Sequence, residues 1–139
     1  MDHARPAARI SGPILDRIDI RIEIPALTWE ELLRATGGES SAVVRQRVLA
    51  ARERQRTRGA LNAMLSYRCL GQHCAPDPAG RRLITDAMDR GGVSARGVHH
   101  ALRVARTIAD LAGESTVNAI GNAEALQYQA YDPSRRAKA

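Results

Sequence analysis

The chain has 139 residues, which is the length of one domain with a modest core. Its 21 basic residues outnumber its 15 acidic ones, so acidic partners such as nucleic acid, nucleotide phosphates or an acidic protein surface stay open. Lys138 is the only lysine, which excludes a complete P-loop within this chain and, because it lies in a polar tail, argues against Schiff-base chemistry. Since no apolar run could span a bilayer and no secretory signal is present, we expect a cytoplasmic protein with no membrane partner.

The N-terminal part of the chain contains one pattern typical of a β-strand. After residues 1–9, which lack periodicity and form an expected flexible segment, isoleucines alternate with charged residues over 18–24. Pro25 ends this pattern, and because a lone strand is unstable, it should pair with a sheet supplied from elsewhere. One or two helical turns capped by Thr28 follow, before a Gly-Gly pair breaks the chain.

The rest of the chain is predicted to be helical. Ser40 or Ser41 can cap a first long helix, and Ser94 caps a later helix with the clearest helical spacing of apolar residues. The stretch 66–78 is expected to be irregular. In chain order, the predicted helical elements cover residues 41–58, 61–65, 79–90, 95–112 and 117–129.

The predicted fold is therefore mainly α, with one orphan β-strand followed by a bundle of four or five helices. A domain that contributes one strand to a sheet it does not contain looks like the back end of a larger α/β protein, cut within its sheet.

Several stretches of the sequence occur in the same order in one known family. The first is Ile-Ser-Gly-Pro-Ile-Leu-Asp-Arg-Ile-Asp-Ile at 10–20, and the longest is Leu-Arg-Val-Ala-Arg-Thr-Ile-Ala-Asp-Leu-Ala-Gly at 102–113. The others lie at 38–41, 50–56, 62–63 and 124–128. Over residues 10–129 the chain thus resembles the C-terminal part of the magnesium-chelatase-like AAA+ ATPases of the ComM/YifB type.

The resemblance implies four parts. Residues 1–9 are a flexible segment, 10–36 are the end of the AAA+ α/β core with the arginine-finger motif and the strand, 37–131 are the helical lid, and 132–139 are a basic tail. The Walker motifs of the family lie upstream, which agrees with the missing lysine. The resemblance also implies ATP and Mg²⁺ as cofactors of the full-length protein and a homo-hexameric ring of neighbouring subunits, whereas this chain alone should neither bind ATP well nor hydrolyse it.

Arg17 matches the Asp-Arg motif of the family, which resembles an arginine finger that reaches the nucleotide of the neighbouring subunit. Phosphoryl transfer is catalysed mainly by positioning and by fixed positive charge near the γ-phosphate, and the guanidinium fork suits that task. The resemblance therefore implies that Arg17 acts in trans. The plainer interpretation is a surface arginine that pairs with Asp16 or Asp19.

Arg96 resembles the lid arginine called sensor 2, because it lies one residue inside the helix that begins after Ser94. The free N–H groups of a helix N-terminus attract phosphate, and an arginine there adds a full charge. Arg103 and Arg106 are alternatives for the nucleotide contact, and each could instead be solvated. The sequence departs from the usual family pattern just after Arg96, where Gly97 and a His-His pair replace an Ala-Tyr-His-Arg-like run.

Six arginines between residues 45 and 58 could follow a nucleic-acid backbone, with Arg47, Arg54 and Arg58 as candidate DNA contacts. A solvated helix face explains the same run equally well. Because Trp29 and three tyrosines are the only aromatic residues, base stacking is not expected, and any DNA contact should be electrostatic and salt-dependent.

Cys69, His73 and Cys74 form a C-x3-H-C cluster, but structural zinc needs four ligands and the sequence offers no second cluster. The adjacent His99 and His100 point in different directions on a helix, unlike a metal-binding pair. We therefore expect no metal site.

The resemblance favours a part of an ATPase that remodels DNA, as in branch migration during natural transformation. Two alternatives stay open: a stand-alone basic helical module that binds DNA or a partner protein, and a chelatase motor that inserts metal into a porphyrin.

Overall fold

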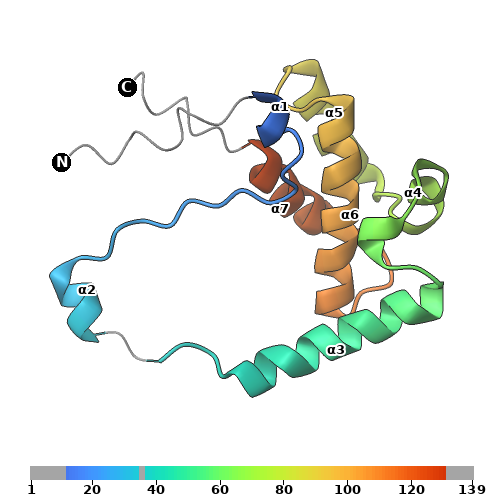
Figure 1. The fold of residues 1–139 in the computed structure, drawn as a ribbon. Helices are drawn as coiled ribbons and strands as arrows, with labels where there is room; N and C mark the ends of the chain where they lie inside the picture. Colours follow the sequence, from blue (N-terminus) through green and yellow to red (C-terminus); the bar gives the residue numbers. More distant parts are fainter. Residues whose placement is uncertain (1–11, 35–36, 131–139) are drawn as a thin grey trace.

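The computed structural model describes residues 12–34 and 37–130, so the segments expected over 1–9 and 132–139 lie outside the described residues. The described part is mainly α-helical, which confirms the predicted fold class (Figure 1). The helices are α1 Gly12–Leu15, α2 Trp29–Arg34, α3 Ser41–Arg58, α4 Tyr67–His73, α5 Pro78–Asp89, α6 Ala95–Ala112 and α7 Ala119–Ala130, with a 3-10 helix, η2, at Asn62–Met64. None of the helices in this part of the chain is long and apolar enough to cross a membrane.

The two longest helices begin and end where local cap chemistry predicts. The side chain of Ser40 accepts a hydrogen bond from the Val43 amide at the start of α3, and Ser94 does the same for Gly97 at the start of α6. At their other ends, Gly59 and Gly113 take the left-handed conformation that glycine adopts at lowest cost. These predicted helix boundaries are confirmed.

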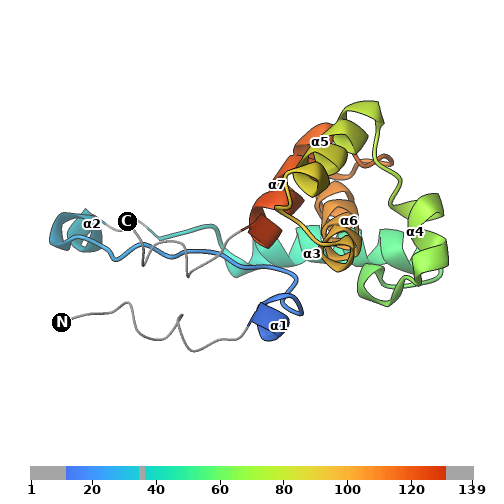
Figure 2. The ribbon, with the colours of Figure 1, turned by 90° about the horizontal axis from the view of Figure 1, so that it is seen from above.

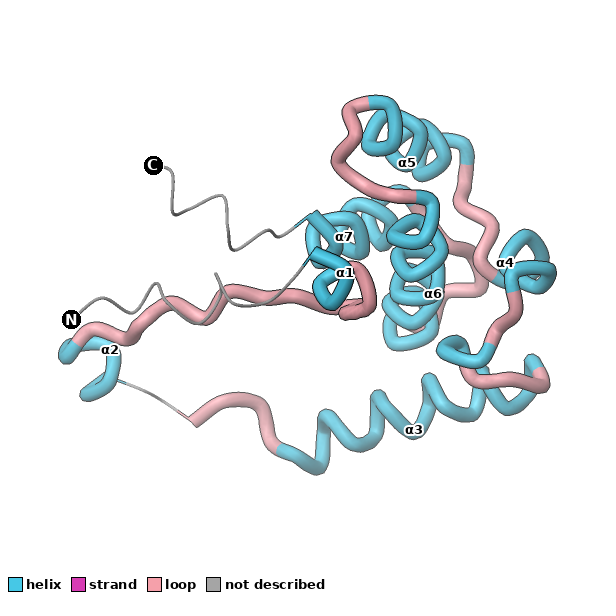
Figure 3. Tube along the Cα trace, turned by 45° about the horizontal axis from the view of Figure 1, so that its top comes forward, coloured by secondary structure: helices cyan, strands magenta, loops and turns pink. Residues whose placement is uncertain are grey.

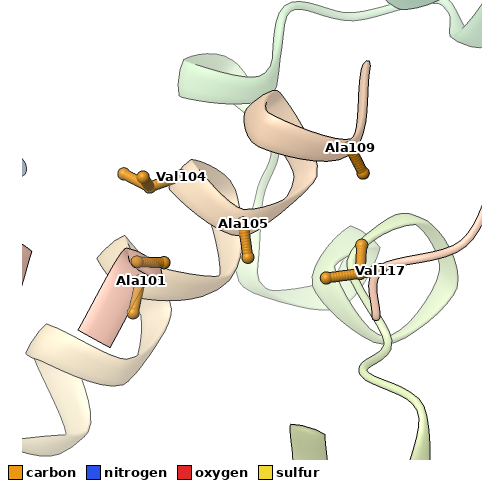
Figure 4. Close-up of a cluster of buried hydrophobic side chains, with 6 residues drawn as sticks. Ala101, Val104, Ala105, Ala109 and Val117 are labelled. Atoms are coloured by element: carbon orange, nitrogen blue, oxygen red, sulfur yellow. The ribbon is translucent and has the colours of Figure 1, made fainter. Parts of the chain in front are cut away.

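Helix α6 lies at the centre of the bundle, and α3, α4, η2 and α7 all pack against it (Figures 1 and 2). The core between α6 and α7 consists mainly of alanine and valine side chains (Figure 4). Such small side chains let the two helix backbones approach closely. The buried members of this core are Ala101, Val104, Ala105, Ala109, Val117 and Ala125.

Two segments extend away from the bundle. Residues 41–50, in the N-terminal half of α3, are all exposed, and the buried positions of this helix begin at Ala51. The stretch from residue 18 to 28 runs outward to α2, which lies apart from the bundle in all three views (Figures 1 to 3). These exposed surfaces carry Ile20, Ile22, Ile24, Leu27, Trp29, Leu32, Leu33, Val43, Val44, Val48 and Leu49.

One expectation is not confirmed and another needs correction. The structure assigns no strand to residues 18–24, and the described ranges contain no strand with which they could pair; because the expected partner sheet is supplied from elsewhere, the strand stays a prediction. The stretch 66–78 is not wholly irregular, since α4 forms within it and buries Leu70 against Leu65 and Cys74. This short helix has Gly71 near its middle, so its sequence signal is weak.

Candidate functional site

The first turn of α6 presents Arg96 to solvent. The Ser94 hydroxyl accepts a hydrogen bond from the Gly97 amide at 3.1 Å, which fixes where the helix starts. Arg96 is exposed, two residues after the cap. The amides of this first turn and the guanidinium together make a positive, open helix end, which is a favourable environment for a phosphate group.

The segment that follows α1 is docked against the same end of the bundle. The side chain of Asp19 pairs with Nδ1 of His100 on α6. The backbone carbonyl oxygen of Asp19 accepts a hydrogen bond from Nε2 of Gln129 on α7 at 2.6 Å. The Arg21 amide donates to the Tyr128 carbonyl at 3.3 Å, and its guanidinium donates to the Gln129 carbonyl. The segment is therefore held to both α6 and α7.

Helix-end chemistry explains this docking. The last four carbonyl groups of a helix lack partners within the helix, and the carbonyls of Tyr128 and Gln129 belong to that group in α7. Arg21 donates to both of them, and its positive charge is favourable at the negative end of the helix dipole. The docking thus satisfies groups that α7 cannot satisfy itself.

Arg17 is exposed and lies two residues before the docked Asp19. The ion pairs of the described residues include one between Asp19 and His100 and none to Arg17. Figure 1 shows α1, just before Arg17, beside the start of α6 and the end of α7. The structure therefore brings Arg17 and Arg96 to the same end of the bundle.

The guanidinium of Arg103 makes contacts within the domain. Its Nε and Nη2 atoms donate to the Leu65 carbonyl at 3.2 and 2.8 Å, and its guanidinium carbon lies 5.7 Å from the centre of the Tyr67 ring. The Tyr67 ring also contacts the ring of His99, with 4.5 Å between the centroids. Arg103 thus fastens the chain after η2 to the middle of α6.

Arg106 is almost fully buried, and its hydrogen-bond partners lie within the domain. Its guanidinium bonds to the Asp110 carboxylate, with the closest N–O distance 3.0 Å. It also donates to the carbonyls of Ser115 and Glu114, at 2.8 and 2.6 Å. Of the three arginines considered for the nucleotide contact, only Arg96 has an exposed side chain.

Asp110 is the centre of a buried polar network that joins α3, η2 and α6. Its carboxylate accepts hydrogen bonds from Arg58, Asn62 and Arg106. Burial raises the pKa of Asp110, but the hydrogen bonds from Arg58 and Asn62 and the charges of Arg106 and Arg58 outweigh it, so the pKa lies below its ordinary value. The carboxylate therefore stays ionised and paired.

The arginines of α3 divide between an exposed face and the bundle. Arg47 is exposed and pairs with Glu39 at 2.6 Å, and Arg54 is exposed with its guanidinium against Gly113 at the end of α6. Arg58, expected as a DNA contact, is turned inward to Asp110, which corrects that expectation. Five other arginines of α3 are exposed, and helical spacing puts Arg45, Arg52 and Arg56 on one side of the helix and Arg47 and Arg54 on the opposite side.

The two cysteines of the C-x3-H-C cluster differ in burial. Cys74 is fully buried with Leu65 and Leu70, and burial raises its pKa to about 11. Cys69 is partly exposed and accepts a hydrogen bond from the Ser66 hydroxyl at 3.2 Å. Within residues 12–34 and 37–130, no three His, Cys, Asp or Glu side chains gather into a group that could hold a metal ion.

Sequence reasoning missed the residues that dock the N-terminal segment, namely Asp19, His100 and Gln129. Their contacts join positions far apart in the chain, and the sequence contains one weak signal of them. His100 follows Arg96 by four residues, which puts both on one face of α6.

The described chain defines a small helical domain, built around one long central helix that begins with an exposed arginine. Residues 38–129 match the family model described as magnesium chelatase, subunit ChlI C-terminal, and the chain belongs to this family. The resemblance found in the sequence is thereby confirmed.

Several curated proteins are similar to this chain. It is 42% identical over 125 residues to Competence protein ComM of Haemophilus influenzae, an alignment that covers 88% of the chain and 24% of that protein. It is 40% identical over 126 residues to Uncharacterized protein YifB of Salmonella typhimurium, covering 89% and 25%. It is 39% identical over 130 residues to Uncharacterized protein Rv2897c of Mycobacterium tuberculosis, covering 90% and 26%. The chain thus spans about a quarter of the length of these relatives.

Proposed function

We propose that this chain forms the lid and arginine-finger part of a magnesium-chelatase-like AAA+ ATPase that remodels DNA. The observation that supports it best is the shared position of Arg17 and Arg96 at the end of the bundle where α6 begins. Family membership and the 42% identity to a competence protein favour the same function.

In this proposal the two arginines act on the charge that develops during phosphoryl transfer. Arg96, at the positive end of α6, contacts the γ-phosphate of its own subunit and reports hydrolysis through movement of the lid. Arg17 reaches the nucleotide of the next subunit in a homo-hexameric ring. The roles proposed here for the two arginines involve no metal ligand, and residues 12–34 and 37–130 contain no group of three His, Cys, Asp or Glu side chains that could hold a metal ion.

Two exposed arginines of α3 support the DNA part of the proposal. Arg47 and Arg54 lie on the same side of the helix, and few aromatic side chains accompany them, so binding would neutralise backbone phosphates without base stacking. A porphyrin chelatase motor and a stand-alone binding module remain the competing functions.

The test of the ATPase role replaces Arg17 and Arg96 by alanine in the full-length ATPase. Each variant should lose most ATP turnover, by about a thousandfold for a finger that acts on the transferred phosphoryl group. In rings that also contain subunits unable to bind ATP, Arg17→Ala should abolish turnover in the neighbouring subunit. Arg96→Ala should abolish turnover in the subunit that carries it. Arg82→Ala, at an exposed position on α5, is the control. Normal turnover of Arg17→Ala would remove the finger role.

The test of the DNA role measures binding of the ring to branched DNA across a range of salt concentrations. The double variant Arg47→Ala/Arg54→Ala should reduce the slope of log affinity against log salt by about two. The exposed pair Arg81 and Arg82 on α5, replaced in the same way, should leave the slope unchanged. An unchanged slope for the α3 variant would exclude this face as the DNA contact and would favour the porphyrin or protein-binding alternatives.

A further inference from the structure

Resting on the function proposed above, we propose that Asp19, His100 and Gln129 form a coupling clamp that positions Arg17 according to the position of Arg96. The clamp would pass a movement of the first turn of α6, in one subunit, to the finger that this subunit offers to its neighbour. These three residues are positioning residues, since they act through Arg17.

The first element of the coupling clamp is the pair between Asp19 and His100. His100 follows Arg96 by four residues on α6, so both side chains lie on one face of the helix, one turn apart. Asp19 follows Arg17 by two residues in the docked segment. The pair therefore joins α6, one turn after Arg96, to the segment that carries Arg17.

The second element is Gln129, whose Nε2 donates to the Asp19 carbonyl at 2.6 Å. Gln129 is buried, and its Oε1 lies 3.6 Å from the place that a β-carbon on Gly97 would occupy. Gly97 directly follows Arg96, so the amide of Gln129 bonds to the segment at Asp19 and lies near the turn that carries Arg96.

The contacts of Arg21 hold the other side of the clamp. Its amide and guanidinium bond to the carbonyls at the end of α7, as described above. With Asp19 fixed from one side and Arg21 from the other, the segment has little freedom to slide along the bundle. A tilt of the first turn of α6 must then move the chain at Asp19, close to Arg17.

Hydrogen exchange on the 139-residue chain tests whether the clamp holds the segment. The Arg21 amide is protected by its bond to the Tyr128 carbonyl, so His100→Ala and Gln129→Ala should each raise its exchange rate about tenfold. Gln127→Ala is the matched control, because Gln127 is an exposed glutamine on the same helix. Exchange of Arg21 that is unchanged in both variants would show that these side chains do not hold the segment.

Turnover in the full-length ring tests the coupling itself. His100→Ala should lower kcat about tenfold or more while KM for ATP stays the same, because the finger is misplaced and nucleotide binding is not. His100→Asn keeps a donor near the position of Nδ1 and should restore most of the turnover. In mixed rings, a His100→Ala subunit that cannot bind ATP should slow hydrolysis in its neighbour.

The two proposals fail in different ways. If Arg17→Ala is inactive but His100→Ala and Asp19→Ala keep normal kcat, the clamp is excluded and the finger stands. If Arg17→Ala keeps normal turnover, the proposed function itself is wrong. A His100→Ala defect that is confined to its own subunit, or that asparagine does not rescue, would show a merely structural role and would also overturn the clamp.

Discussion

Arg58, the last residue of α3, and Asp110, near the end of α6, form an ion pair with 2.6 Å between Nη2 and Oδ1. Their side chains are 14% and 0% exposed, so the pair lies almost entirely inside the protein. Arg106 bonds to the same carboxylate from one turn earlier on α6. This buried network fastens the long basic helix to the centre of the bundle.

Removing the carboxylate should strongly destabilise the domain. Asp110→Ala removes the carboxylate that pairs with the buried Arg106 and with Arg58, and breaking a buried ion pair in this way costs about 3–5 kcal/mol in the free energy of unfolding. Urea unfolding measures the effect. Glu53→Ala is the control, since it breaks an ion pair with Arg56 in which the Arg56 side chain is 81% exposed and the Glu53 side chain 64%. This control should change the free energy of unfolding by less than about 0.5 kcal/mol. Equal losses in both variants would contradict the central role of Asp110.

The lowered pKa of Asp110 predicts a dependence of stability on pH. A carboxylate whose pKa is lower in the folded state stabilises the fold above its ordinary pKa of 3.8, and this contribution is lost as pH falls through the folded-state value. The urea midpoint of the wild type should therefore fall more steeply below about pH 4 than that of Asp110→Asn. Parallel curves for the two proteins would contradict this assignment.

The two cysteines should differ in reactivity with a thiol reagent. The pKa of Cys74 is raised from 9.0 to about 11 by burial, so at pH 8 it stays a neutral, enclosed thiol. The partly exposed Cys69 should react first in the native protein, and Cys69→Ser should remove the fast phase. Because the Cys74 pKa is higher in the folded state, its contribution to stability is present below pH 9 and is lost between about pH 9 and 11.

Two glycines inside helices should respond oppositely to alanine. A β-carbon on Gly80 would lie 2.5 Å from Nδ2 of Asn122, where α5 packs on α7, so Gly80→Ala should destabilise the fold by about 1–3 kcal/mol. Gly71 on α4 has open space around it, and Gly71→Ala should stabilise by about 0.5–1 kcal/mol. Thermal unfolding of the two variants provides the comparison. A stabilised Gly80→Ala would show that Asn122 moves aside at little cost.

The sequence predicted what depends on local chemistry. Ser40, Ser94, Gly59 and Gly113 mark helix ends through bonds and dihedral angles within a few residues, and the structure confirms each. Thr28 likewise caps α2: its hydroxyl oxygen accepts a hydrogen bond from the Glu31 amide, and the Glu31 carboxylate accepts hydrogen bonds from the Thr28 amide and hydroxyl.

Long-range contacts account for what the sequence did not show. The inward turn of Arg58 depends on Asp110, 52 residues away, and the docking of Asp19 depends on Gln129, 110 residues away. The spacing of Arg106 and Asp110 by four residues within an apolar stretch was a usable signal of a buried pair. The shared position of Arg17 and Arg96 had no such signal, because only the fold brings them to one end of α6.

Helix α6 has its exposed arginine at one end and its buried tie to α3 at the other. Its 18 residues measure about 27 Å, which makes it a rigid lever between the two. A tilt of about 10° around its first turn would displace its last turn, and the basic helix fastened there, by about 5 Å. A small rotation where phosphate would bind would therefore move the surface proposed to contact DNA, because the Arg58–Asp110 pair holds α3 to the last turn of α6.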